Sequence, residues 1–337
     1  MRIGTAALER WTARRELAAG GRGGGDGASA GAGYMLLAMA GFTFNDALAK
    51  GIGDSLSVAQ LIAVRGTMLI VLMGVFFTIR ERRGSTAVPL LEATRRAVHQ
   101  PLVLARSLCE LLATAAFLTA LTKLPFAVLA SMLQSMPLLV TAGAALFLGE
   151  TVGWRRWLAI VAGLCGVLVI LRPGGSAFAG TGLAFGIGCV LLSAGRDLCT
   201  RRIPAEVPSL GVTMVSVLLM TLCALAWCTL GGEWRTMSVA QLALLAGAAL
   251  CLFAGMQGIV LAMRSGDVAA IMPYRYTGLV WAVLLGWLFY AEVLDLWTLV
   301  GGAIVVGTGL YTFARERRVA RRAMTQPGVA VPMRPSI

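Results

Sequence analysis

The sequence contains little histidine, little lysine and little charge of either sign. Of 337 residues, one is histidine, two are lysine and 13% are charged, whereas about 25% of residues are charged in an average soluble protein. Hydrophobic residues make up 58% of the chain, which leaves too few polar residues to cover the surface of soluble domains. The composition excludes soluble, disordered and collagen-like chains, and it predicts a protein embedded in a membrane.

The sequence also lacks the clusters that metal or nucleophilic chemistry requires. Its seven cysteines lie inside or beside apolar runs, and no two form a Cys-x-x-Cys pair. Isolated cysteines in such runs pack as small hydrophobic side chains. His99 lies in a polar joint, where a solvated side chain is the ordinary interpretation. We therefore expect no metal, no cofactor and no catalytic residue.

The first 31 residues are basic and then glycine-rich. They lack the continuous apolar stretch of a cleavable signal peptide. Their glycine run at 20–27 also lacks the Lys-Ser/Thr of a phosphate-binding loop. We interpret residues 1–31 as a disordered cytosolic tail.

Ten apolar runs follow, each close to the ~20 residues that an α-helix needs to cross a ~30 Å hydrocarbon core. They lie at 32–50, 58–79, 103–122, 125–149, 154–171, 180–200, 209–230, 239–263, 267–290 and 296–314. Lipid offers no partner for a free backbone N–H or C=O group, so each run is predicted to be a helix. The predicted fold class is an all-α integral membrane protein with ten transmembrane helices.

Basic residues are concentrated in every second joint between these runs. With both tails included, the joints on one side carry 21 Lys or Arg residues, and those on the other side carry 4. Cytosolic segments are enriched in Lys and Arg, so both termini of this multi-pass membrane protein are predicted to be cytosolic. The same distribution accounts for the net charge of +13 without a nucleic-acid partner.

The two halves of the chain resemble each other at an offset of 142 residues. The aligned positions include Leu146, Phe147 and Glu150 with Leu288, Phe289 and Glu292. Two arginines follow the first set and no base follows the second, which indicates opposite sides of the membrane. Five runs per copy is an odd number, so the second copy is predicted to be inverted. Inverted repeats recur in secondary transporters, whose cargo sites lie near the membrane midplane.

Several motifs resemble the half-repeat of the drug/metabolite transporter superfamily, EamA branch. In the first half they are Leu121-Thr-Lys-Leu-Pro125-Phe-Ala-Val, Leu148-Gly149-Glu150, Trp157 and Gly163-Leu-Cys-Gly166; in the second, Pro273, Gly286, Glu292 and Gly301-Gly302. The resemblance implies a transporter of the inner (cytoplasmic) membrane, with a central cavity between two inverted five-helix repeats at 32–171 and 172–318. Residues 319–337, which follow the repeats, are predicted to be a cytosolic tail. More finely, Phe44-Asn45-Asp46 and Pro273-Tyr274-Arg275-Tyr276-Thr277 are similar to a bacterial branch that includes riboflavin importers and S-adenosylmethionine carriers.

Ionisable residues inside the runs are the first candidates for function, because each costs at least ~2.5–3.5 kcal/mol to insert. They are Arg65, the i, i+4 pair Arg106 and Glu110, and Arg275. The alternative for each is a salt bridge or carbonyl contact that holds helices together. Arg275 has no acid nearby in sequence, and a guanidinium binds carboxylate, phosphate or imide oxygens and stacks on rings. Arg275 is therefore the first candidate for a cargo contact.

Polar, aromatic and proline residues complete the predicted site. Further cargo contacts are expected at Tyr274, Tyr276, Gln134, Gln257 and Trp281, helix bends at Pro137 and Pro273, and a gate or cargo contact at Asn45 and Asp46. Gln134 aligns with Tyr276 at the offset of 142, so this pair is expected to face the cavity from the two halves. Lys50 lies at i+4 from Asp46, where it is expected to neutralise that acid.

The charges predict the kind of cargo. An unpaired arginine repels a cation by ~4 kcal/mol at 4 Å in a medium of effective dielectric constant 20, so the sequence predicts a small neutral or anionic metabolite. Riboflavin is the specific prediction, and S-adenosylmethionine or an amino acid is the alternative within the same family. An integral-membrane lipid-modifying enzyme is the alternative class, but it would need clustered Asp, His or Cys. The sequence leaves the direction of transport, the coupling ion and the oligomeric state open.

Overall fold

A computed structural model describes residues 24–53, 55–84, 88–149, 153–171, 180–204, 206–265, 271–293 and 295–325. At 24–28, 171, 264–265 and 316–325 only the backbone is described. Most of the predicted N-terminal tail, the last twelve residues and Glu150 lie outside the described residues. Helix α2 already begins at Gly24, inside the predicted tail, so the helix of the first run continues into a glycine-rich stretch whose helix propensity is low.

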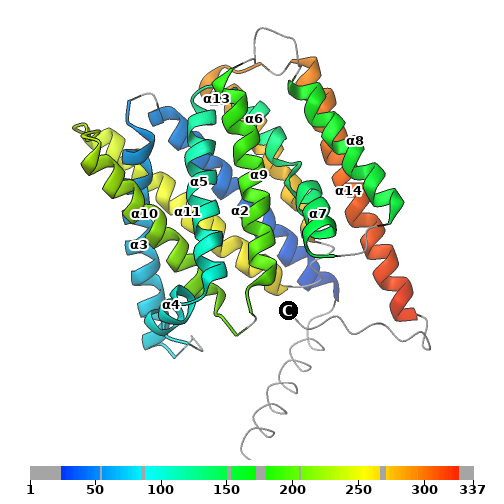
Figure 1. The fold of residues 1–337 in the computed structure, drawn as a ribbon, viewed down its shortest axis with the longest axis horizontal. Helices are drawn as coiled ribbons and strands as arrows, with labels where there is room; N and C mark the ends of the chain where they lie inside the picture. The colour runs from blue at the N-terminus through cyan, green and yellow to red at the C-terminus, as the bar shows by residue number, and fades with distance from the viewer. Residues whose placement is uncertain are drawn as a thin grey trace, which may run out of the picture.

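All regular structure in the described residues is helical (Figure 1). The helices are α2 (Gly24–Gly53), α3 (Val58–Arg82), α4 (Leu90–Val98), α5 (Pro101–Leu121), α6 (Phe126–Leu133), α7 (Met136–Phe147), α8 (Trp154–Leu171), α9 (Thr181–Arg202), α10 (Ser209–Leu230), α11 (Val239–Ser265), the 3₁₀-helix η1 (Met272–Tyr276), α13 (Thr277–Tyr290) and α14 (Leu296–Thr325). Each of the ten predicted runs contains a helix. Seven of these stretches, with α6 and α7 counted as one, are long and apolar enough to cross a membrane.

Two of the predicted runs are interrupted. The run at 125–149 contains α6 and α7, which are separated at Gln134 and Ser135. The ninth run contains the tight turn η1 before α13 begins. Pro137 and Pro273 lie in the first turn of α7 and of η1, where the missing N–H group of proline costs no helical hydrogen bond. Both prolines therefore lie at the interruptions of these spans.

The short helix α4 is an element that hydrophobic runs do not predict. Its buried residues Ala93 and Ala97 face α10, while Arg95 and Arg96 form its basic last turn. Gly211 of α10 allows this contact, because a Cβ at that position would lie 2.0 Å from the Ala93 carbonyl oxygen. The basic joint between the second and third runs is therefore an amphipathic helix packed across one end of the bundle (Figure 1).

The helix contacts of one half correspond to those of the other half. Helix α2 packs along α11 as α9 packs along α5, and α3 packs on α11 as α10 packs on α5. The pairs α3–α10 and α8–α14 each join equivalent helices of the two halves. Exchanging the two sets of five spans in order maps these contacts onto one another. The packing has the pattern that an internally duplicated chain with two-fold pseudosymmetry would produce.

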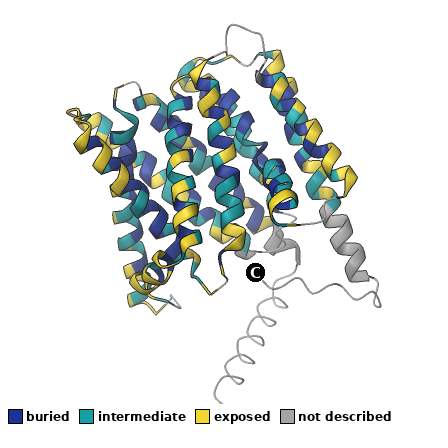
Figure 2. Ribbon diagram, viewed as in Figure 1, coloured by how far each residue is buried: buried dark blue, intermediate teal, exposed yellow. Residues whose placement is uncertain are grey.

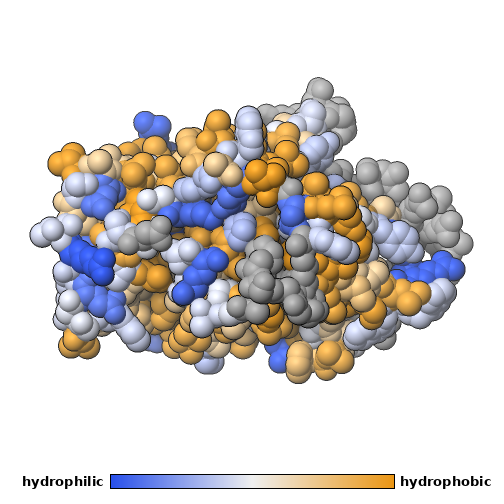
Figure 3. Space-filling view, turned by 90° about the horizontal axis from the view of Figure 1, so that it is seen from above, coloured by the Kyte–Doolittle hydropathy of each residue, from blue (hydrophilic) through white to orange (hydrophobic). Residues whose placement is uncertain are grey.

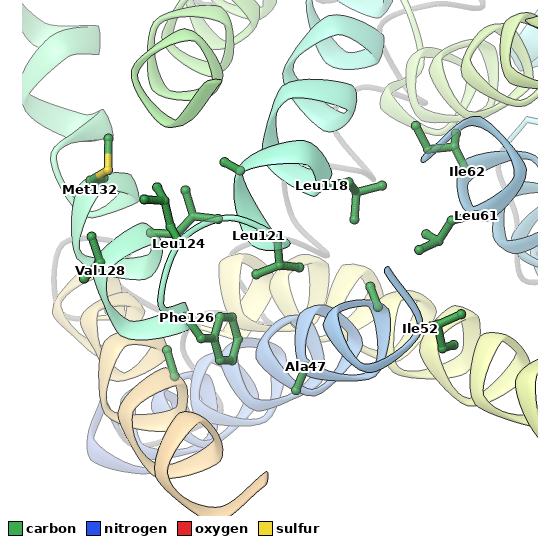
Figure 4. Close-up of a cluster of buried hydrophobic side chains, with 14 of the residues drawn as sticks. Ala47, Ile52, Leu61, Ile62, Leu118, Leu121, Leu124, Phe126, Val128 and Met132 are labelled. Atoms are coloured by element: carbon green, nitrogen blue, oxygen red, sulfur yellow. The ribbon is translucent and has the colours of Figure 1, made fainter. Parts of the chain in front are cut away.

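Buried side chains lie on the inward faces of the helices, and exposed side chains cover the outward faces (Figure 2). Many exposed residues are large and apolar, among them Leu37, Val71, Leu168 and Leu222. Apolar surface of this extent is unusual on a soluble monomer, but it is the surface that lipid requires. The largest buried cluster joins the end of α2, the start of α3, the end of α5 and α6 (Figure 4).

Candidate functional site

A cavity of about 1030 Å³ lies between helices of the two halves. This volume is at the upper end of the range for small-molecule sites. Nine of the predicted site residues line it: Asn45, Asp46, Arg65, Arg106, Glu110, Gln134, Pro137, Gln257 and Arg275. The fold therefore collects around one chamber residues that lie up to 230 positions apart in sequence.

Four predicted site residues, namely Tyr274, Tyr276, Trp281 and Pro273, are not among the lining residues. Tyr276 is buried with its ring 6.3 Å from that of Phe313, and the Trp281 ring lies 6.2 Å from that of Phe44. A 3₁₀-helix has three residues per turn, so successive side chains of η1 point in three directions. Arg275 consequently faces the cavity while its two tyrosine neighbours do not.

The aromatic side chains on the cavity wall are instead four phenylalanines that the sequence did not single out. They are Phe42, Phe77, Phe117 and Phe126. Nothing in their spacing distinguishes them from phenylalanines that face lipid or the core. They give the chamber apolar walls beside its charged groups.

One polar cluster joins α2 and α3. Arg65 is only 5% exposed, and its Nη1 donates to the Oδ1 of Asn45 at 3.1 Å. The Nδ2 of Asn45 in turn donates to the Oδ1 of Asp46 at 2.8 Å. Lys50, one turn further along α2, pairs with Glu292 of the other half. The expectation that Lys50 neutralises Asp46 is therefore wrong.

A second polar cluster joins α5, α9 and α10. The predicted pair is present, with Arg106 Nη2 lying 3.5 Å from Glu110 Oε2. The other carboxylate oxygen of Glu110 accepts from Arg196 Nη1 at 3.0 Å, and Arg196 also binds Asp197 at 2.8 Å. Arg106 additionally donates to the hydroxyl groups of Thr200 and Ser216. Glu110 therefore joins two arginines that come from different halves of the chain.

Arg196 and Asp197 line the cavity but were not predicted as site residues. A signal for them exists in the sequence, at an offset of 151 residues rather than 142. This offset aligns Asn45-Asp46 with Arg196-Asp197, and it aligns Arg106 with Gln257. The offset changes because the joints of the two halves differ in length, so an ungapped comparison finds only one half of the correspondence.

Arg275 remains without a partner in this arrangement. Within the part of the chain that the structure describes, its guanidinium makes no hydrogen bond or ion pair, although Asp197 and Arg196 lie within electrostatic range. Each of the two polar clusters contains as many acids as arginines. Including Arg80 near α4, five arginines and three acids line the cavity. The chamber therefore has an excess of positive charge.

Gln134 connects the two interrupted spans. Its Nε2 donates to the carbonyl oxygen of Tyr276 at 3.3 Å. The break between α6 and α7 thus contacts the end of η1, and Gln134 and Arg275 approach the cavity from the two halves. Discontinuous helices at a pseudo-two-fold axis are the usual setting of transporter cargo sites.

The model of the EamA-like transporter family matches the chain twice, at residues 29–172 and 180–313. The chain belongs to this family, which confirms the predicted resemblance. Together with the apolar helices, this membership makes the protein a multi-pass membrane transporter.

The similar proteins include S-adenosylmethionine uptake transporters, riboflavin transporters and a pseudopaline exporter of Pseudomonas aeruginosa, which is 24% identical over 283 residues. The chain is 25% identical over 296 residues to an S-adenosylmethionine uptake transporter of Rickettsia conorii, covering 87% of this chain and 95% of the relative. It is 28% identical over 221 residues to a riboflavin transporter of Rhizobium johnstonii, covering 65% and 72%. A crystal structure of another protein superposes with a TM-score of 0.58 at 18% identity, covering 84% of this chain and 99% of that one. That likeness concerns the fold alone.

Proposed function

We propose that this protein is a secondary transporter of the inner (cytoplasmic) membrane that moves a small neutral or anionic metabolite by alternating access. In this proposal, ten spans form two inverted repeats at 32–171 and 172–318, and both termini are cytosolic. The double family match, the exchangeable helix contacts and the basic joints support this arrangement. The cavity is then the cargo site, because it lies where the two halves meet.

The prediction of a neutral or anionic cargo rests on one observation, namely that the guanidinium of Arg275 faces the cavity without a partner among the described residues. A permanent cation placed 4 Å from it would be repelled by ~4 kcal/mol at an effective dielectric constant of 20. A carboxylate, phosphate or imide oxygen would instead accept charge-assisted hydrogen bonds from it. The excess of positive charge around the cavity therefore favours neutral and anionic cargo.

Riboflavin is the specific cargo that we propose. Its flavin ring carries imide oxygens that match Arg275 and the amide of Gln134, and its faces match the phenylalanines of the cavity wall. A relative from Rhizobium johnstonii that is named a riboflavin transporter supports this choice. The stacking partners differ from those expected from the sequence, since Tyr274, Tyr276 and Trp281 do not line the cavity.

The experiment is growth of a riboflavin auxotroph at low vitamin concentration, together with uptake of labelled riboflavin into proteoliposomes. Growth and saturable uptake are the expected results. Absence of both, at good membrane abundance, would remove riboflavin and leave the transporter class intact.

S-adenosylmethionine is the second candidate cargo, because a relative with that name matches 87% of this chain. The same proteoliposomes distinguish the two cargos by competition of each unlabelled compound against labelled uptake. Amino acids belong in the same screen. Turnover of lipid precursors by the purified protein, in place of any uptake, would instead favour the membrane-enzyme alternative.

A further inference from the structure

Lys50 and Glu292 form an ion pair between the two halves of the chain. The distance from Lys50 Nζ to Glu292 Oε1 is 2.6 Å, and the two side chains are 15% and 16% exposed. The same Nζ donates to the carbonyl oxygen of Leu124 at 3.0 Å. The other carboxylate oxygen accepts from the backbone N–H of Phe126 at 2.7 Å. The pair therefore ties the end of α2 and the end of α13 to the joint between α5 and α6.

The local backbone holds the carboxylate of Glu292 in place. Ala291 has φ 51°, a left-handed conformation that ends α13, and the N–H of Glu292 then donates to the Gly286 carbonyl at 3.1 Å. A Cβ on Gly286 would lie 2.9 Å from Glu292 Oε2, so the glycine leaves room for this carboxylate. The neighbouring Tyr290 O–H donates to the carbonyl of Ala47 at 2.5 Å. Tyr290 and Glu292, two residues apart in one half, thus both contact α2 of the other half.

A cluster of buried apolar side chains lies beside the ion pair. Figure 4 shows Ala47, Leu121, Leu124 and Phe126 converging from α2, α5 and α6 in the largest buried cluster. Viewed from this end, the surface shows hydrophilic residues set among hydrophobic ones (Figure 3). The cavity lining includes Phe126 of this cluster but neither Lys50 nor Glu292, so the cavity stops short of the ion pair.

The cavity extends toward the opposite end of the bundle. Its lining there includes Arg80 at the end of α3, Ala93 of α4 and Leu210 at the start of α10. Figure 1 shows α4 at the end of the bundle away from the labels of α6 and α13. The two ends of the cavity therefore differ, and the ion pair lies at the closed one.

We propose that the Lys50–Glu292 pair and its two backbone contacts form a latch, which holds this end of the cavity closed and breaks when the cavity opens there. This inference rests on the proposed function, since only a cavity that opens alternately needs a releasable closure. An ion pair suits that role because both ions regain full hydration on opening, which offsets much of the lost attraction. The Phe126 N–H, in the first turn of α6 without a helical partner, regains water in the same way.

The test measures access to the cavity without any cargo. A reporter cysteine replaces the cavity-lining Ala130, in a background whose native cysteines are serine or alanine. Thr236→Cys, in the exposed joint near the start of α3, identifies the membrane face on which the latch lies. We expect Glu292→Gln to increase labelling of the reporter from that face by an impermeant maleimide about tenfold, which equals about 1.4 kcal/mol in the opening equilibrium.

Glu233→Gln is the matched control, because it makes the same change at the same end of the bundle, where the Glu233 carboxylate accepts a hydrogen bond from Trp227 Nε1 at 3.0 Å. It should leave labelling unchanged. Lys50→Met should act like Glu292→Gln, and the exchanged pair Lys50→Glu with Glu292→Lys should restore slow labelling. Unchanged labelling in both single variants, in protein that elutes as a folded species, would overturn the latch. Because the assay contains no cargo, failure of riboflavin transport would not affect its outcome.

Discussion

In the proposed function, selection of cargo by charge depends on Arg275. Its guanidinium faces the cavity from a 3₁₀ turn and has no partner among the described residues. We expect Arg275→Gln to weaken cargo binding by about 1.5–3 kcal/mol, or roughly 10–150-fold in Kd, the usual range for hydrogen bonds to charged groups. Saturable uptake at matched membrane abundance measures this. Arg235→Gln, in an exposed joint, is the control, and an unchanged Kd in Arg275→Gln would exclude it as a cargo contact.

Glu110 is the residue whose loss should most disturb the polar network. Glu110→Gln leaves Arg106 and Arg196 without their shared carboxylate. Removing one partner from a fully buried pair costs about 3–5 kcal/mol, and the partial exposure of this site lowers the expectation to about 1–3 kcal/mol. Thermal unfolding in detergent measures the difference. Glu92→Gln, which breaks an exposed i, i+4 pair with Arg96 on α4, should change stability by about 0.5 kcal/mol or less. Equal shifts would contradict a structural role for Glu110.

A contact in the site could be predicted from the sequence only when both of its residues lie on the same helix. Pairing of Arg106 with Glu110 follows from spacing along one helix, and the structure contains it. The pairs Lys50–Glu292 and Arg196–Glu110 join different helices, and spacing along one helix cannot predict them. The side-chain directions of Tyr274 and Tyr276 depended on a 3₁₀ turn that the apolar run conceals. Charged residues inside the predicted spans indicated which residues form the site. Their arrangement in space depends on contacts between helices, which only the structure gives.

At the scale of helices, close packing of α8 on α14 makes one glycine critical. A Cβ on Gly301 would lie 2.5 Å from the carbonyl oxygen of Gly166, so Gly301→Ala must separate the two helices. Gly307, on the same helix, has nothing within 4 Å of its would-be Cβ. We expect Gly301→Ala to lower stability by about 1–3 kcal/mol. Gly307→Ala should leave it unchanged or raise it by up to about 1 kcal/mol, and thermal unfolding compares them. Equal behaviour would contradict the packing described.

Hydrophobic runs located the helices better than they located the breaks. Each run predicted by length and apolarity contains a helix, because lipid imposes both properties on the sequence. The division of the fourth span at Gln134 and the helix α4 were not predicted. The first break is stabilised by contacts with the other half, such as Gln134 to Tyr276, and α4 by its packing on α10. Neither contact affects the hydropathy of the surrounding sequence, so hydropathy alone could not predict the break or the helix.

At the scale of the whole molecule, the described conformation is one member of an expected pair. The most extensive helix contacts map onto one another when the two halves are exchanged, yet the cavity extends to the α4 end and does not reach Lys50 and Glu292 at the other. In an inverted repeat, exchanging the conformations of the two halves would close the α4 end and open the end that holds Lys50. Under the proposed alternating access, the second state would therefore follow from the asymmetry of the described one.

The inversion itself is testable at two joints that the repeat makes equivalent. Gly153, before α8, and Val293, before α14, are both exposed. We expect single cysteines at these two positions to be labelled by an impermeant maleimide from opposite faces of the membrane, because an odd number of spans separates the two copies. Permeabilised membranes serve as the control for total reactivity. Labelling of both positions from one face would contradict the inverted repeat and, with it, alternating access by exchange of the two halves. The cavity and its excess of arginine would then require another mechanism.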